Sequence, residues 1–192
     1  MNPLIDTLPT AVRVDGEVFP IHADYKTCLK IMLAFEDREL NLFEKQSVML
    51  TLLFGERIPE NTAEALRLAV KFLNCGEESC EKESVTEHCG RLFSFEKDAQ
   101  YILTAVNQTH GVNLERENPH WWKFVYMFMD LKEDCFFNRI LYLRSQKQKG
   151  KLTPDERKTW DKMRDVLELE TENPADADEN LQAFLQELNG GE

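Results

Sequence analysis

Apolar residues recur at intervals of three and four through most of the 192-residue chain, and this period restricts the fold more than any other feature. The spacing is that of one face of an α-helix, so it predicts amphipathic helices that share a core. Capping residues or first-turn prolines mark the helix starts expected after Asp24, after Asn61, at Asn118-Pro119, at Asp134 and at Thr153-Pro154. Apolar periodicity alone predicts two more helices, which begin near Leu42 and after Ser94. The sequence therefore predicts a mainly α protein, built as a single helical-bundle domain.

The apolar residues of three expected helices predict how each of these helices is buried. The helix after Asn61 carries a stripe of Ala63, Leu66, Val70 and Leu73, and the helix at Asp134 carries Phe136, Phe137, Ile140 and Leu141 on one face. The segment from Trp121 to Met129 is apolar nearly all round, which places it at the centre of the bundle. Trp121 and Trp122 could stack on a ligand, but core packing is the stronger interpretation for aromatic residues at helical spacing.

Residues 11–21 depart from the helical period. Val12 and Val14 fall on one face of a strand, and Asp15-Gly16 is a pair that tolerates the positive φ of a tight turn. The pattern predicts a short N-terminal β-hairpin. Two strands alone are marginal in water, so we expect this hairpin to lie on another element.

The net charge of −12 is unevenly distributed. Residues 165–192 carry nine acidic side chains and no Lys or Arg, whereas residues 1–164 carry 26 acidic and 23 basic side chains. Aromatic residues show the opposite bias, with 18 of 19 between Phe19 and Trp160. We therefore expect one domain over residues 1–170, followed by an acidic linker and a short amphipathic tail helix over residues 171–192.

This charge argues against a general nucleic-acid binder, because an acidic chain repels a phosphate backbone over most of its surface. Residues 132–164 differ, since they hold ten Lys or Arg against five Asp or Glu. The candidate nucleic-acid contacts there are Arg139, Arg144, Lys147, Lys149 and Lys151. The stronger interpretation makes these side chains the solvated face of an amphipathic helix. A second alternative is that the acidic tail pairs transiently with this face, although exposed ion pairs contribute little.

Neither export nor membrane insertion is expected. The N-terminus lacks the basic and apolar regions of a signal peptide, and no stretch reaches the eighteen or more apolar residues of a membrane helix. An odd number of cysteines, five, in a chain large enough to form its own core indicates reduced thiols.

A polar loop at residues 74–90 contains the only candidate metal ligands. Cys75, Cys80, His88 and Cys89 are soft ligands of the type that zinc binds, but they lack a CxxC pair. Five glutamates in the same loop fit a solvated acidic segment better. We expect no bound metal and no cofactor, and a zinc-stabilised adaptor or regulator remains the alternative.

Catalysis finds no support in the sequence. Cys28 and Cys135 are expected on apolar helical faces, where a cysteine behaves as a small hydrophobic residue. The histidines have no partners at a spacing that suggests a triad, and the glycines form no phosphate-binding pattern. We therefore expect a protein that is not an enzyme.

The tail carries a second apolar stripe beyond a linker that is rich in Pro and Asp. It is too short for a stable helix alone, so it either docks on its own domain or folds into a groove of a partner. Its residues are the candidate partner-binding site: Leu181, Phe184, Leu185 and Leu188.

Two sequence blocks resemble a known family. They are FSFEKDAQYI at residues 93–102 and HWWKF at residues 120–124, and weaker matches are Val14-Asp15-Gly16, Leu53-Phe54-Gly55, Ile58-Pro59 and Ile140 with Arg144. Over about residues 8–170 the chain resembles tail proteins from siphophages and prophages of Gram-positive bacteria, whose gene usually lies just upstream of the tape measure gene.

The resemblance implies a tail assembly chaperone. Such a protein binds the hydrophobic tape measure protein, assists assembly of the tail tube protein, and is absent from the finished virion. It implies a location in the cytoplasm of the bacterial host, self-association, and no catalytic residues. The alternative is an adaptor or regulator, stabilised by zinc or using the basic face of residues 132–164, that binds protein or nucleic acid.

Overall fold

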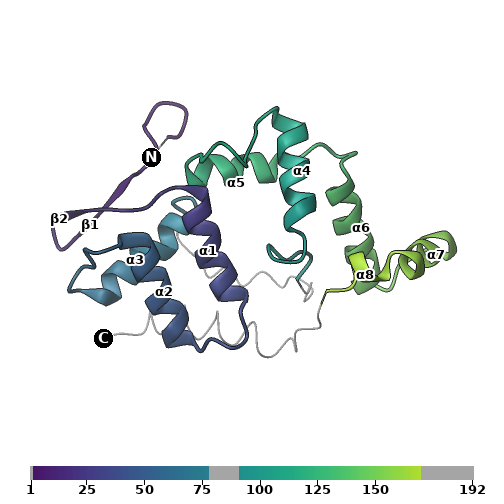
Figure 1. The fold of residues 1–192 in the computed structure, drawn as a ribbon, viewed down its shortest axis with the longest axis horizontal. Coiled ribbons are helices and arrows are strands. Elements are labelled where there is room, and N and C mark those ends of the chain that lie inside the picture. Colours follow the sequence, from purple (N-terminus) through teal and green to yellow (C-terminus); the bar gives the residue numbers. More distant parts are fainter. Residues whose placement is uncertain (1, 78–90, 170–192) are drawn as a thin grey trace. The chain divides into compact units, whose positions relative to one another are not determined.

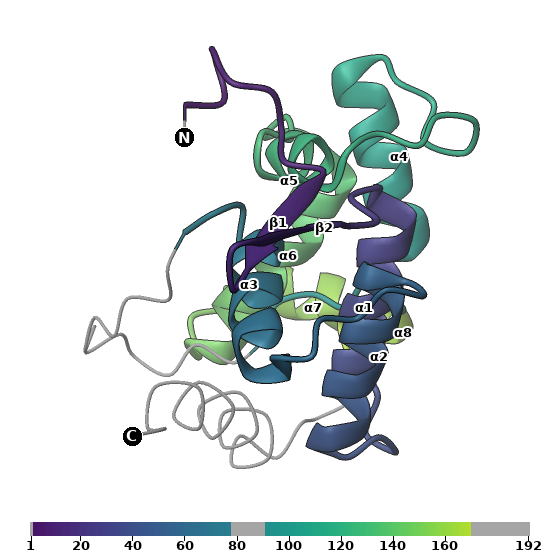
Figure 2. The same cartoon turned by 90° about the vertical axis from the view of Figure 1, so that its left-hand side faces the viewer.

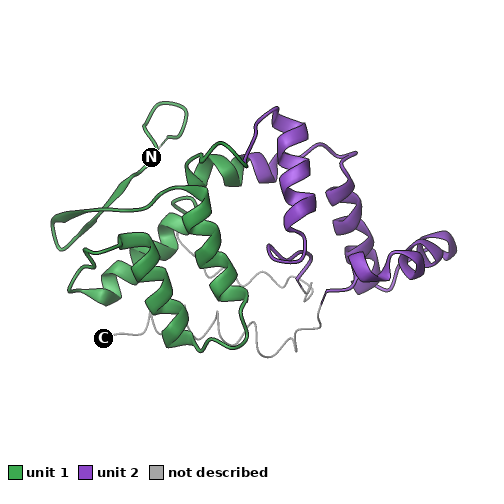
Figure 3. Cartoon of the chain, viewed as in Figure 1, with its two compact units in different colours: residues 1–81, 115–126, 178–192 green, residues 82–114, 127–177 purple. Residues whose placement is uncertain are grey.

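The structure is a computed structural model that describes residues 2–77 and 91–169 (Figure 1). Within these ranges the chain forms eight helices and a two-stranded antiparallel sheet, which confirms the mainly helical class with an N-terminal hairpin. The described residues divide into two compact units (Figure 3). Unit 1 contains residues 2–77 and 115–126, and unit 2 contains residues 91–114 and 127–169. The domain expected over residues 1–170 includes both units and stays a prediction.

The hairpin consists of β1 (Ala11–Val14) and β2 (Glu17–Pro20), as predicted, with Val12 opposite Phe19. Its turn uses the expected positive φ, 47° at Asp15 and 85° at Gly16. The hairpin lies beside α3 (Thr62–Leu73) in both views (Figures 1 and 2). Asn61 Nδ2, at the start of α3, donates to the carboxylate of Asp15 at 3.0 Å. The expected support for the hairpin is therefore a helix of unit 1.

The first two helices of unit 1 begin at polar caps. The Asp24 carboxylate caps α1 (Tyr25–Glu36) and accepts from the backbone N–H of Thr27 at 3.0 Å, as predicted. A reciprocal capping box of Asn41 and Glu44 starts α2 (Leu42–Phe54), where the helix was expected but no cap was predicted. Gly55, with φ of 64°, ends α2.

The stripe expected on α3 is wrong by about one residue. Ala63 is exposed, and the three larger members of the stripe are only half-buried. The buried face instead consists of Ala65, Ala69 and Phe72. Phe72 packs against the rings of His120 and Trp122, with centroids 5.8 and 5.9 Å away, so this face turns inward and the leucines lie at the edge of the contact.

The helix that contains the tryptophan pair, α5 (Trp121–Met129), begins later than expected. Asn118 and Pro119 do not start it, because both are used to bind the start of α1. The Asn118 amide donates to Asp24 Oδ1 at 3.1 Å, and the Pro119 carbonyl accepts from the backbone N–H of Tyr25 at 2.9 Å. The helix was also expected to be buried on all sides, but one part of it faces solvent, since Met129 is 80% exposed.

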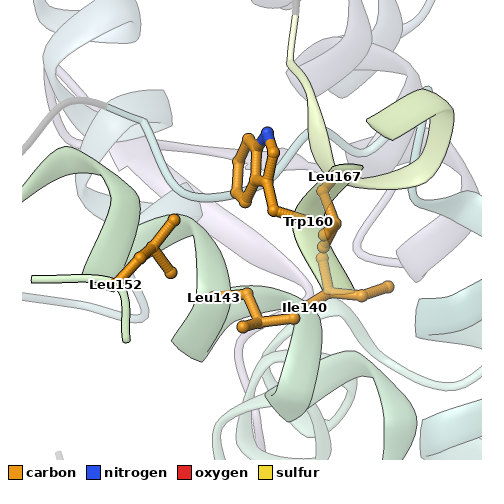
Figure 4. Packing of buried hydrophobic residues seen from close by; sticks show 5 residues of the cluster. All are labelled: Ile140, Leu143, Leu152, Trp160 and Leu167. Atoms are coloured by element: carbon orange, nitrogen blue, oxygen red, sulfur yellow. The ribbon is translucent and has the colours of Figure 1, made fainter. Parts of the chain in front are cut away.

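Unit 2 contains α4 (Ala99–His110), α6 (Phe136–Gln148), α7 (Pro154–Lys162) and α8 (Arg164–Leu167). The predicted capping box of Thr153 and Glu156 starts α7. The cap of α6 is Cys135 rather than Asp134, since the sulfur accepts from the backbone N–H of Asn138 at 3.4 Å. One buried apolar cluster joins α6, α7 and α8 (Figure 4) through Ile140, Leu143, Trp160 and Leu167, with Leu152 added from the connection between α6 and α7.

Candidate functional site

The HWWKF block lies in unit 1, where its two indole groups bind the end of α3. Trp121 Nε1 donates to the Leu73 carbonyl at 2.9 Å, and Trp122 Nε1 donates to the Phe72 carbonyl at 2.7 Å. Both tryptophans are buried. Their N–H groups are occupied inside the fold, which confirms the core-packing interpretation.

This arrangement completes the hydrogen bonding at the C-terminus of α3. A helix leaves its last four carbonyl groups without internal partners. The backbone N–H groups of Asn74 and Gly76 bind the first two, while Cys75 N–H and the two indoles bind the last two. Gly76 has a φ of 87°, and a β-carbon there would lie 3.0 Å from Trp122 Cη2. The tryptophan pair therefore donates to the last carbonyls of α3, at the point where the chain turns sharply through Gly76.

His120 connects the same block to the N-terminal segment. Its Nε2 lies 2.9 Å from the Pro9 carbonyl, while Nδ1 accepts from the backbone N–H of Trp122 at 3.1 Å. These two contacts require the neutral tautomer with the proton on Nε2. Phe124 stacks on Tyr25 with ring centroids 5.1 Å apart. The block is used to hold unit 1 together.

The FSFEKDA block lies in unit 2 and contributes one half of a buried ion pair. Arg144 binds Asp98 through two hydrogen bonds of 2.6 and 2.9 Å, and the two side chains are 3% and 0% exposed. The same guanidinium donates to the carbonyls of Leu92, Val166 and Leu167 at 2.8–3.0 Å. All five N–H donors of the arginine are thus used.

Arg144 corrects an interpretation made from the sequence. It was expected on the solvated face of α6 and among the candidate nucleic-acid contacts, but it is buried with Phe137, Ile140 and Leu143. Its carboxylate partner lies 46 residues away, a distance at which helical spacing carries no information. The sequence did contain one indication that Arg144 has a structural role, because Arg144 and Ile140 are together one of the weaker matches to the family.

The remaining residues of the FSFEKDA block shape the start of α4. The Ser94 hydroxyl accepts from the backbone N–H groups of Glu96 and Lys97, at 3.2 Å each, and the Ser94 N–H donates to Asp98 Oδ2 at 3.0 Å. Phe93 packs edge-on to Phe95, with ring centroids 5.2 Å apart. Both family blocks therefore have structural roles, one in each unit.

The other candidate nucleic-acid contacts are exposed. Arg139, Lys147, Lys149 and Lys151 all lie at the surface of unit 2. Lys147 Nζ lies over the Trp160 ring, 5.3 Å from its centre, which is a cation–π contact at the surface. A basic surface is present without Arg144.

The three described cysteines, Cys28, Cys75 and Cys135, are free thiols. Burial, together with the charge of Asp24, raises the pKa of Cys28 to about 12, and burial raises that of Cys75 to about 11. Cys28 lies on the buried face of α1 as predicted, whereas Cys135 caps a helix instead of lying on an apolar face.

No cluster of metal ligands occurs in residues 2–77 and 91–169. Cys80, His88 and Cys89 lie outside these ranges.

The candidate partner-binding residues, Leu181, Phe184, Leu185 and Leu188, also lie outside the described residues. Within the described part, large exposed apolar side chains are spread over both units: Leu4, Ile5, Val18, Phe43, Ile58 and Tyr126 in unit 1, and Met129, Phe136 and Tyr142 in unit 2. No helix of the described ranges is long and apolar enough to cross a membrane.

Comparison with known proteins identifies the family. No curated protein and no solved structure matches the chain. A family model does match, over residues 4–169, and its description is Bacteriophage Gp15 protein. This range includes every described helix, both hairpin strands and both sequence blocks. The chain therefore belongs to the Bacteriophage Gp15 protein family.

Proposed function

We propose that this phage protein is a non-catalytic tail assembly chaperone that binds the tape measure protein and assists assembly of the tail tube. The observation that carries the proposal is membership of the phage family over residues 4–169. The resemblance of the FSFEKDA and HWWKF blocks to tail proteins supplies the narrower function. We place this activity in the cytoplasm of the bacterial host and expect the protein to be absent from the finished virion.

The internal chemistry of the two blocks supports a binding role over catalysis. The Asp98 carboxylate, the Arg144 guanidinium and the two indole N–H groups all have partners inside the fold. Groups that are held in this way stabilise the units and are poorly placed to act on a substrate. The family features thus act as a scaffold, and we assign function to the surface and the tail.

The tail is the proposed site for the client. A chaperone of an apolar helix needs an apolar surface that stays soluble, and charged flanks provide that solubility. The stripe of Leu181, Phe184, Leu185 and Leu188 has Glu179 and Glu187 beside it. An amphipathic segment of this type can pack along a helical client through its apolar side chains.

Co-expression with helical fragments of the tape measure protein from the same phage tests the proposal. The full chain should keep the fragments soluble and co-purify with them. Replacing Leu181, Phe184, Leu185 and Leu188 with serine should abolish co-purification while the helical circular dichroism of the domain is retained.

A matched control keeps the apolar stripe and removes its charged neighbours. Glu179→Gln with Glu187→Gln should still bind the fragments. If the serine variant binds as well as the full chain does, the tail is not the binding site. If the full chain fails to bind or solubilise any fragment, the proposed chaperone function is wrong.

A further inference from the structure

Unit 2 carries a basic surface, which we define as the exposed cations between residues 139 and 164. Its members are Arg139, Lys147, Lys149, Lys151, Arg157, Lys158, Lys162 and Arg164. The same stretch of sequence contains three carboxylates, those of Asp155, Glu156 and Asp161. Lys158 pairs with Asp155, and Arg164 pairs with Glu168. The three lysines at 147, 149 and 151 have no acidic neighbour between residues 139 and 154.

The point at which the acidic tail begins is fixed next to this surface. Leu167 is fully buried in the same cluster as Leu152 and Trp160 (Figure 4). Lys151 directly precedes Leu152, and Lys147 Nζ lies over the ring of Trp160. The buried Arg144 holds the Leu167 carbonyl, and Lys97 Nζ donates to the carbonyl of Glu168. The end of unit 2 is therefore anchored by several bonds beside the lysines.

The tail carries negative charge, the opposite of the charge on this basic surface. Residues 170–192 contain seven acidic side chains and no Lys or Arg. An extended segment of this length reaches roughly 75 Å, far more than is needed to return to a surface at its own root. Because the tail is covalently joined to unit 2 at this point, docking is intramolecular, and the effective concentration of such a tethered segment is on the order of millimolar.

We propose that residues 170–192 dock on the basic surface of their own chain and shield it from other polyanions. Tethering favours this occupant over a nucleic acid, which must also overcome the repulsion of an acidic chain. Single exposed ion pairs contribute little, so the association depends on many charges acting together and weakens as salt rises. This inference uses acidic residues and a surface of unit 2, and it does not depend on the proposed function.

The test uses the full chain with part of the tail charge removed. The tail variant carries Glu170→Gln, Glu172→Gln, Asp176→Asn and Asp178→Asn, which leave the apolar stripe unchanged. The control variant carries Glu39→Gln, Glu56→Gln, Glu60→Gln and Glu77→Gln, four exposed residues of unit 1 with the same charge. Both raise the net charge by the same amount, so a difference between them reports location rather than total charge.

Binding to a 20-base-pair DNA duplex at low salt is the first measurement. The tail variant should bind on the order of tenfold more tightly than the unmodified chain, because its basic surface is uncovered. The control should change much less. Adding Lys149→Glu and Lys151→Glu to the tail variant should remove the gain. Equal gains in the tail and control variants would overturn the proposal.

Carbodiimide cross-linking of the unmodified chain is the second measurement. Bonds should form between tail carboxylates and Lys147, Lys149 or Lys151 within one molecule, and they should decrease as salt rises. Cross-links that join the tail to lysines of unit 1, or that join two copies, would overturn docking on the chain's own basic surface.

Discussion

The two units use different chemistry to secure the same kind of feature, a backbone segment that regular structure leaves without partners. In unit 1, two neutral indole N–H groups bind the last carbonyls of α3. In unit 2, the Arg144 guanidinium binds the carbonyl of Leu92 and two carbonyls at the end of α8. The buried carboxylate of Asp98 neutralises this arginine. The HWWKF block supplies both indoles, and the FSFEKDA block supplies the carboxylate of the ion pair, so the family resemblance reflects two separate structural needs.

The solutions differ in how they fail. A neutral donor can be removed at the expense of one unsatisfied carbonyl, whose effect is limited to about 1–3 kcal/mol. Removing one member of a buried ion pair leaves an uncompensated charge away from water, which is more damaging. Unit 2 should therefore be more sensitive to the loss of one member of its ion pair than unit 1 is to the loss of one indole donor.

The largest effect is expected from Arg144→Met. This change leaves the Asp98 carboxylate buried without its cation, and it should lower the free energy of unfolding of unit 2 by about 3–5 kcal/mol. Hydrogen exchange of amides in α4 and α6 measures the loss locally. Arg139→Met, on the exposed face of the same helix, should change stability by less than about 0.5 kcal/mol. A loss below about 1 kcal/mol for Arg144→Met would remove the contrast between the units.

Trp121→Phe should have the next largest effect. Leu73 O loses the indole donor and the ring leaves a small void, so unit 1 should lose about 2–3 kcal/mol. Trp122→Phe is the matched control, because Phe72 O keeps the backbone N–H of Cys75 at 3.0 Å. Urea denaturation followed by circular dichroism should rank Trp121→Phe as the more destabilising change. The reverse order would show that ring packing, rather than the hydrogen bond, decides the site.

Gly76→Ala tests whether the turn after α3 requires glycine. The positive φ is unfavourable for alanine, and the new methyl group would press on the Trp122 ring. We expect a loss of about 2 kcal/mol in unit 1. Gly111→Ala in unit 2 has a φ of 65° but no heavy atom within 4 Å, so it should show only the backbone penalty of about 1 kcal/mol. Equal thermal shifts for the two variants would rule out a steric contribution from the indole.

The capping boxes offer a comparison in which the units should agree. Asn41→Ala in α2 and Thr153→Ala in α7 each remove a side-chain acceptor for the N–H three residues later. Each should reduce stability by about 1 kcal/mol, because both caps are exposed. Hydrogen exchange in the first turn of each helix measures the change. A much larger loss at one cap would indicate that tertiary contacts depend on that helix start.

The smallest effect is expected on acidification. Hydrogen bonding with Arg67 lowers the pKa of Glu64 in unit 1 below 4.5, and the backbone and hydroxyl of Thr153 do the same for Glu156 in unit 2. A lowered folded pKa gives stability above pH 4.5 that is lost as the pH falls through the folded value. Glu64→Gln and Glu156→Gln should therefore be less stable than the unmodified chain at pH 7, and their stability should converge with that of the unmodified chain in strong acid. A thermal-shift series from pH 7 to pH 3 checks this.

The sequence indicated those features that depend on neighbours along the chain. Asp24, Asn61 and Thr153 were identifiable as caps because a cap and its target N–H are three residues apart. The Asp15-Gly16 turn and the glycine at position 55 could be read for the same reason. Helix class, hairpin and most boundaries follow from such local rules.

The helix starts that were misplaced depend on distant residues. Asn118-Pro119 has the composition of a cap, but the N-terminus of α1 binds both residues and moves the start of α5 to Trp121. Cys135 caps α6 although a thiol is an uncommon choice. The sequence shows which residues are able to cap, whereas competition for their donors and acceptors is decided by the fold.

Arg144 shows the same limit for the candidate sites. Its charge and helical position are typical of a solvated residue, and only the carboxylate of Asp98, brought near by the packing of α4 on α6, makes burial favourable. The charge of the tail, the basic stretch before it and the period of the helices were all present in the sequence. Which cations remain at the surface was decided by tertiary structure, because burying an ion depends on a partner that local spacing cannot supply.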